Sequence, residues 1–90
     1  MLERELEVIN AKGLHLRAAS ELVKLTSNMS CKVSLANETI EVDGKSILGV
    51  AALGAGKGCR ITVRTDGEDE QHAIDQIQDL FQRGFYENVS

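Results

Sequence analysis

The sequence has no proline, no tryptophan and few aromatic side chains, which are two phenylalanines and one tyrosine. All three lie close together, at Phe81, Phe85 and Tyr86. Nucleic-acid binding requires a basic surface and aromatic platforms on which bases stack, whereas this chain has a net charge of −4. We therefore exclude a nucleic acid as a partner. Because proline is absent, the turns must rely on glycine, asparagine, aspartate or serine.

A long hydrophobic run is also missing. No apolar stretch approaches the roughly 20 residues that span a bilayer, so no membrane insertion is expected. The first five residues carry acids where a secretory signal would have basic residues followed by an apolar stretch. These features predict a cytoplasmic protein. We expect residues 1–90 to form a single, monomeric domain.

Cysteine is scarce as well, with only Cys31 and Cys59. They form no CxxC pair and have no pair of histidines nearby, which argues against a metal site. Both lie in apparent strands, so we predict that both are small buried residues of the core. The chain has no Ser-His-Asp set and no pair of catalytic carboxylates. We therefore expect no metal, no cofactor and no enzyme active site with a substrate pocket of its own.

The chain does contain a regular succession of hydrophobic patterns. Alternation of apolar and polar residues predicts four strands, at residues 2–9, 31–35, 39–42 and 59–65. Helical spacing predicts helices at residues 16–27 and 47–53, and a last helix that opens with acidic residues at 66–70 and continues to about residue 84. The tail from residue 85 onward is expected to fray, although Phe85 could pack back on the core.

This order of elements, βαββαβα, indicates an α+β fold. The second and third strands follow each other across a short turn at Asn37-Glu38, as in a hairpin, which excludes a parallel doubly wound sheet. We predict a four-stranded antiparallel sheet with three helices on one face, which makes a two-layer sandwich. The opposite face of the sheet is mostly charged or polar, as an open face requires.

The short helix at residues 47–53 is unusual because it is apolar nearly all round. Ser46 precedes it and is well placed as its N-cap. A helix of two turns on a small domain cannot bury every face, so some of Ile47, Leu48 and Ala52 should be exposed and should dock a partner. The alternative is that this helix simply lies deep in the core.

Glycines follow this helix in the stretch Gly54-Ala55-Gly56-Lys57-Gly58. A phosphate-binding loop stands between a strand and a helix in that order, whereas this loop follows a helix and precedes a strand. We reject a phosphate loop here and interpret Gly54 as the stop signal of the helix.

The stretch most indicative of chemistry is Gly13-Leu14-His15-Leu16-Arg17-Ala18-Ala19-Ser20. A glycine turn delivers His15 to the start of a helix, where backbone N–H groups lack partners and the helix dipole is positive. These amides and the Arg17 guanidinium could hold an anion attached to the imidazole. We therefore predict that His15 accepts and passes on a phosphoryl group. The alternative is that His15 is a turn histidine without a role. The other histidine, His72, lies among acids in the last helix, and we interpret it as structural or idle.

Several of these segments together resemble one known family across essentially the whole chain. They are Gly13-Leu14-His15-Leu16-Arg17, Lys45-Ser46-Ile47-Leu48-Gly49-Val50, Leu53-Gly54, Lys57-Gly58 and Gly67-Glu68-Asp69-Glu70. In this order and spacing they resemble the HPr family, the histidine-containing phosphocarrier proteins of the bacterial phosphotransferase system. The resemblance implies an open-faced β-sandwich with sheet order 1-4-2-3 and a cytoplasmic location.

The resemblance also implies partners and roles. The carrier would take phosphate from enzyme I, itself charged by phosphoenolpyruvate, and pass it to IIA-type acceptors in sugar uptake or in nitrogen-linked regulation. His15 would be phosphorylated through Nδ1 with Arg17 as charge partner, and Ser46 matches the site of a regulatory serine kinase and phosphorylase. The positions that match the docking surface are Leu16, Ser20, Lys24, Ser27, Ile47, Leu48 and Ala52.

The chain departs from the family pattern at Ala18, where a proline usually follows the arginine. Alanine is a good helix former, so the helix should persist with less pre-organisation. Two alternatives follow. One is a regulatory paralogue that binds partners without efficient phosphate relay. The other is a domain that binds a small ligand in a pocket lined by the glycines of residues 54–58. The tail Leu80-Phe81-Gln82-Arg83-Gly84-Phe85 resembles the nitrogen-branch members, whereas the stretch around Ser46 resembles members with the regulatory serine.

Overall fold

The computed structural model describes residues 1–87. Its elements follow the predicted order βαββαβα and end in a 3-10 turn. They are β1 (Leu2–Glu7), α1 (Leu16–Thr26), β2 (Lys32–Ala36), β3 (Glu41–Asp43), α2 (Ile47–Ala52), β4 (Arg60–Asp66), α3 (Glu70–Gln82) and η1 (Gly84–Tyr86). The first strand ends at Glu7, two residues earlier than predicted. The next residue, Val8, pairs with the turn before β4, because its N–H donates to the carbonyl of Cys59 and its C=O accepts the N–H of Gly58.

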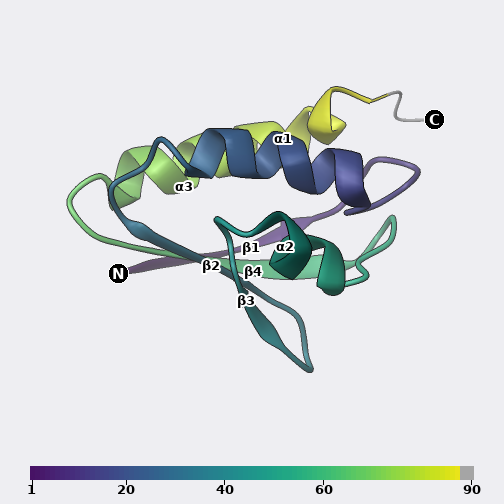
Figure 1. Cartoon of the computed structure of the whole chain (residues 1–90), viewed down its shortest axis with the longest axis horizontal. Coiled ribbons are helices and arrows are strands. Elements are labelled where there is room, and N and C mark those ends of the chain that lie inside the picture. Colours follow the sequence, from purple (N-terminus) through teal and green to yellow (C-terminus); the bar gives the residue numbers. More distant parts are fainter. Residues whose placement is uncertain (88–90) are drawn as a thin grey trace.

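The four strands form one antiparallel sheet in the order β1-β4-β2-β3. The predicted hairpin is present as the pair β2 and β3, and β4 is inserted between β1 and β2. Figure 1 shows α1 and α3 side by side over one face of this sheet, with α2 at their edge. The predicted two-layer α+β sandwich, open on one face, is therefore confirmed.

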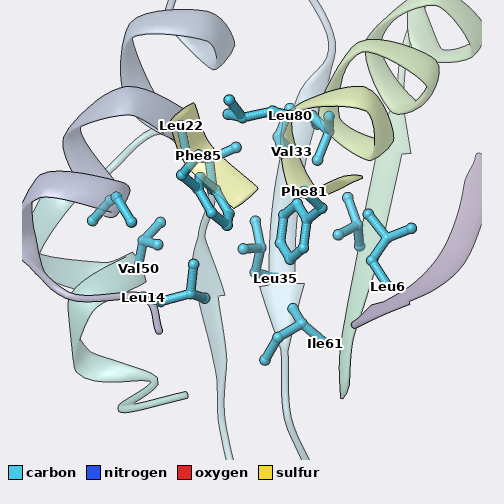
Figure 2. Close-up of a cluster of buried hydrophobic side chains, with 14 of the residues drawn as sticks. Leu6, Leu14, Leu22, Val33, Leu35, Val50, Ile61, Leu80, Phe81 and Phe85 are labelled. Atoms are coloured by element: carbon cyan, nitrogen blue, oxygen red, sulfur yellow. The ribbon is translucent and has the colours of Figure 1, made fainter. Parts of the chain in front are cut away.

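The core lies between the sheet and the helices, and Figure 2 shows its principal side chains. Leu35 and Ile61 come from the sheet, Leu22 from α1 and Phe81 from α3, and each is almost completely buried. The faces of α1 and α3 that meet the sheet are buried at Ala19, Leu22, Thr26, Ala73, Ile77, Leu80 and Phe81, and Val23 of α1 is half-buried. Burial of this kind is the main force that holds helices of about three turns on a sheet, because helices of that length are marginal on their own.

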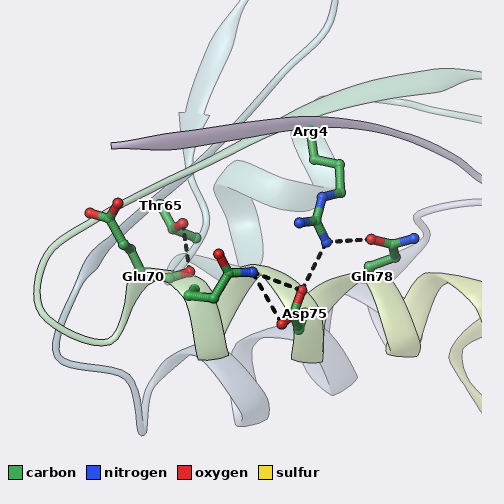
Figure 3. Close-up of polar contacts among 6 residues, drawn as sticks. Arg4, Thr65, Glu70, Asp75 and Gln78 are labelled. Atoms are coloured by element: carbon green, nitrogen blue, oxygen red, sulfur yellow. Dashed lines mark hydrogen bonds and ion pairs between the residues drawn. The ribbon is translucent and has the colours of Figure 1, made fainter.

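One charged side chain also faces the helix layer. Arg4 of β1 donates to Asp75 and Gln78 of α3, as Figure 3 shows. The bond from Arg4 is the main cause that lowers the pKa of the Asp75 carboxyl, with a second bond from Gln71. This contact links α3 to β1 at the edge of the core.

The opposite face of the sheet carries ion pairs instead of a core. Arg64 bonds to Glu3 on one neighbouring strand and to Glu41 in β3, and Arg60 bonds to Glu5. Exposed pairs of this kind add little stability. They keep this face soluble, as the sequence predicted.

The prediction that both cysteines are buried is wrong for one of them. Cys31 is buried, but Cys59 is exposed. Cys59 lies in the turn that precedes β4, where its N–H bonds to Gly56, so the alternation inside the strand does not decide where its side chain points. The expected fraying of the tail does not occur at residues 85–87; Phe85 packs back on the core instead, the possibility that the sequence left open, with its ring centroid 4.9 Å from that of Phe81. Residues 88–90, to which the same prediction applied, lie outside the described part. In residues 1–87 no helix has the length and apolar character to traverse a bilayer.

Candidate functional site

The predicted site begins with a tight turn between β1 and α1. The N–H of Gly13 donates to the carbonyl of Asn10 at 3.1 Å, and the N–H of Leu14 donates to Ala55 at 2.8 Å. Gly13 has φ +68°, and a Cβ at this position would lie 2.2 Å from the Ala55 oxygen. Only glycine fits both the backbone angle and the close approach. The glycine loop at residues 54–56 therefore supports the turn that carries His15.

His15 is the N-cap of α1. Its backbone is extended, at φ −74° and ψ 179°, and its ring Nδ1 accepts the N–H of Arg17 at 3.3 Å. The His15 side chain is 29% exposed, so the ring can be reached from outside. Leu16 and Arg17 are both exposed beside it. Ala18 is buried. The helix is intact at this residue, as predicted for alanine in the position where the family usually has proline.

The N–H of Arg17 is thus held by the ring itself and not by a third group. A negatively charged group attached to Nδ1 would lie against this amide and could take over its hydrogen bond. Arg17, the next residue but one, is exposed on the same turn and brings a positively charged guanidinium to this end of the helix. The arrangement provides a place for an anion on Nδ1.

The other ring nitrogen contacts the C-terminal tail. Nε2 of His15 lies 2.5 Å from Oε2 of Glu87, and Oε1 of Glu87 accepts a bond of 2.9 Å from the side-chain amide of Asn10. The same amide donates to the carbonyl of Gly13 at 2.8 Å. Three segments far apart in the sequence therefore meet at one imidazole.

Glu87 is ionised in this setting. The hydrogen bond from Asn10 is the largest influence on the pKa of the Glu87 carboxyl and lowers it. Partial burial raises the pKa, but the bond and charge of His15 and the charge of Arg17 lower it further, so the net direction is downward. An ionised carboxylate only accepts hydrogen bonds, so the proton between Glu87 and the ring belongs to Nε2.

The residues predicted as a docking surface lie on α1 and α2, which pack against each other. Leu16, Ile47 and Leu48 are 60%, 37% and 77% exposed, which leaves an apolar patch on the surface. The alternative of an α2 buried on all sides is wrong, because only Val50 within this helix is buried. The other predicted positions are Ala52, Lys24 and Ser27, which are exposed, and Ser20, which is half-buried.

Ser46 caps α2 as predicted, because its Oγ accepts the N–H of Gly49 at 3.0 Å. Gly54 follows the end of this helix with φ +61°, as expected of a helix stop. An open depression of 770 Å³ runs past Gly54, Gly58 and Arg60, but His15 does not line it. The second histidine, His72, is exposed on α3.

Sequence reasoning missed two residues at this site. The local sequence pattern assigns no role to Asn10, and Glu87 falls in the tail that is expected to fray. Asn10 is fully buried, which is unusual for a side-chain amide. No local signal links Glu87 to His15, because 72 positions separate them and no regular element connects them directly.

Comparison with known proteins agrees with this architecture. Residues 2–83 match the family model described as the PTS HPr component phosphorylation site. The chain is 44% identical over 89 residues to the phosphocarrier protein HPr of Xylella fastidiosa strain Temecula1, covering 99% of this chain and 100% of that protein. It is 42% identical over 87 residues to HPr of Cupriavidus necator, covering 97% and 98% of the two chains. A solved structure, HPr-C-His from Thermoanaerobacter tengcongensis, is similar with a TM-score of 0.93 and 32% identity, covering 99% and 100% of the two chains.

Proposed function

This chain belongs to the HPr family of phosphocarrier proteins of the phosphotransferase system, and we propose that it carries a phosphoryl group on Nδ1 of His15. The donor is phosphorylated enzyme I, which is itself charged by phosphoenolpyruvate. The acceptors are IIA-type proteins of sugar uptake or nitrogen-linked regulation. The carrier works in the cytoplasm as a monomer. The observation that carries the proposal is an accessible imidazole at the N-terminus of α1, with Arg17 on the same turn.

The chemical step is a displacement at phosphorus. The lone pair of Nδ1 forms the new N–P bond, while the N–P bond of the donor phosphohistidine breaks and its electron pair returns to the donor nitrogen. Such a transfer depends on alignment and on charge stabilisation more than on covalent assistance. The N–H of Arg17 and its guanidinium supply both to the phosphoryl oxygens.

The site must release the group as readily as it receives it. One helix terminus and one arginine hold a phosphoryl group less firmly than an enclosed cage would, and the partial exposure of the ring lets both partners reach the same atom. The apolar patch formed by Leu16, Ile47 and Leu48 borders this end of α1 and offers a surface on which both partners dock in turn.

The test is incubation with phosphoenolpyruvate and enzyme I. The protein should gain one acid-labile phosphoryl group, and His15→Ala should gain none because the acceptor nitrogen is gone. His72→Ala, which removes the exposed histidine of α3, is the matched control and should be phosphorylated like the parent. A parent protein that binds enzyme I but stays unphosphorylated would favour the regulatory paralogue instead.

Ser46 supports a second, regulatory role at the same surface. Its Oγ already interacts with the first turn of α2, so a phosphoryl group there would gain the N–H groups of that turn. It would also place negative charge beside the exposed Ile47 and Leu48 and so weaken docking. Ser46→Asp should therefore slow phosphorylation by enzyme I. The comparison variant is Ser27→Asp, at the end of α1 opposite to His15, which should slow it less. Equal rates for Ser46→Asp and the parent would argue against this role.

A further inference from the structure

The tail of the chain reaches the imidazole through a defined turn. Gly84, Phe85 and Tyr86 all have left-handed backbone angles, with φ +61°, +56° and +62°. Such angles are unfavourable for phenylalanine and tyrosine and persist only where the surroundings enforce them. Burial of the Phe85 ring against Phe81 provides that constraint. Glu87 therefore lies beside His15 because the buried Phe85 ring anchors the segment that precedes it.

Asn10 holds the carboxylate on its other side. Both groups that face the Asn10 amide, the Gly13 carbonyl and Oε1 of Glu87, are acceptors, so the NH₂ group must point toward them. This orientation leaves Oδ1 of Asn10 buried without a hydrogen-bond partner among residues 1–87. A buried orphan oxygen costs free energy, which a smaller apolar residue would avoid. The cost is consistent with a role for Asn10 in placing Glu87.

The two contacts at the ring have opposite requirements, and together they define one tautomer. The N–H of Arg17 needs a lone pair on Nδ1, whereas the carboxylate of Glu87 needs a proton on Nε2. Holding both nitrogens also restricts rotation of the imidazole plane. The nitrogen that keeps its lone pair for bond formation is therefore Nδ1, the one at the helix terminus.

We propose that Glu87, held by Asn10, is a positioning residue that keeps the His15 proton on Nε2 and the nucleophilic lone pair on Nδ1. This inference rests on the proposed function. When Nδ1 forms the bond to phosphorus, the proton stays on Nε2 and the ring becomes positively charged. The Glu87 carboxylate then faces that charge and stabilises the phosphorylated ring, while Arg17 remains available to the phosphoryl group.

The experiment compares Glu87→Ala, Glu87→Gln and the control Glu38→Gln in two measurements. Glu38 is exposed in the turn between β2 and β3, and its side chain makes no hydrogen bond or ion pair within residues 1–87. The first measurement is the kinetics of phosphorylation by enzyme I, with kcat and KM separated. The second is the ¹⁵N spectrum of the His15 ring at about pH 9, where an ordinary imidazole is neutral.

We expect Glu87→Ala to lower kcat by about tenfold with KM unchanged, the size typical of losing a group that orients a histidine. Glu87→Gln should lie between, because its amide oxygen still accepts from Nε2 but carries no charge. In the ¹⁵N spectrum the parent should show a protonated Nε2 and a bare Nδ1, and Glu87→Ala should show a mixture of the two tautomers. Glu38→Gln should match the parent in both measurements.

An unchanged tautomer in Glu87→Ala would overturn the inference, and so would an unchanged or increased kcat. An increase would mean that the carboxylate repels the incoming phosphoryl group. The ¹⁵N measurement needs no partner, so it tests the inference even if the parent protein is not phosphorylated. In that case the proposed function fails separately.

Discussion

Two carboxylates, Glu87 and Asp69, join distant segments at opposite ends of the helix layer, near the start of α1 and the start of α3 (Figure 1). Glu87 contacts a side-chain amide and an imidazole, which is a group that can gain and lose a proton. Asp69 accepts the backbone N–H groups of Ser30 and Cys31 at 2.9 and 2.8 Å. These two backbone N–H groups do not gain or lose protons near neutral pH, so the bonds to Asp69 hold two segments of the fold together.

The difference indicates that the contact at one end of the helix layer stabilises the fold, while the contact at the other end adjusts the proposed reactive group. The pKa of the Asp69 carboxyl is lowered, first by the bond from Ser30, and its two backbone donors are fixed parts of the chain. The bonds that Asp69 accepts can persist throughout, because the proposed reaction does not involve Asp69. At the other end a similar carboxylate is paired with the group that we propose to react, and the rigid support comes instead from Gly13 and the loop at residues 54–56. Three changes test this division.

The largest effect is expected at Gly13. Gly13→Ala places a methyl group 2.2 Å from the Ala55 oxygen at φ +68°, so we expect a loss of about 3 kcal/mol in the free energy of unfolding. Gly54→Ala is the control, because φ is +61° but no atom lies within 4 Å of the new methyl, and it should cost only about 1 kcal/mol. Urea denaturation measures both. Equal losses would show that the close approach to Ala55 does not matter.

A smaller effect is expected at Asp69. Asp69→Asn keeps one acceptor oxygen and turns an NH₂ group toward the other backbone donor, so Tm at neutral pH should fall by roughly 5 °C. Because the folded-state pKa of Asp69 is lowered, its contribution is complete above the ordinary carboxyl pKa and is lost as pH falls through the lowered value. The difference between parent and variant should therefore shrink below about pH 4.

Calorimetry across this pH range checks the prediction for Asp69. The phosphorylation rate of Asp69→Asn should equal that of the parent under conditions where both are folded. Glu87→Gln should show the reverse, with a change in Tm below about 2 °C because the glutamine oxygen can still accept the Nε2–H of His15. Similar behaviour of the two variants in both measurements would contradict the comparison.

The smallest effect concerns the two thiols. Burial is the main cause that raises the pKa of the Cys31 thiol, and the neighbouring Asp69 raises it further, while Cys59 is exposed. A thiol reagent should therefore modify Cys59 rapidly in the native protein and reach Cys31 only on unfolding, since the thiolate is the reactive form. Cys59→Ser should abolish the fast phase without affecting Tm. A fast reaction at Cys31 would mean that the Asp69 end opens readily.

The sequence alone determined features that depend on neighbours along the chain. Alternation predicted the strands, because successive side chains of a strand point to opposite faces, and the hairpin followed from the short turn between β2 and β3. Ser46 and His15 were identified as the starts of helices, because a cap satisfies amides two or three residues ahead. The apolar patch on α2 followed from having too many apolar residues for one buried face.

Tertiary structure decided what joins residues far apart in the sequence. The side chain of Cys59 points outward because its residue lies in a turn one position before β4, and only packing reveals which side of that boundary it occupies. Asn10 and Glu87 meet His15 because the buried Phe85 ring fixes a left-handed turn after α3. The periodicity of a sequence specifies which way a side chain faces within an element. The partner of a side chain after the chain has folded back depends on contacts that no local pattern encodes.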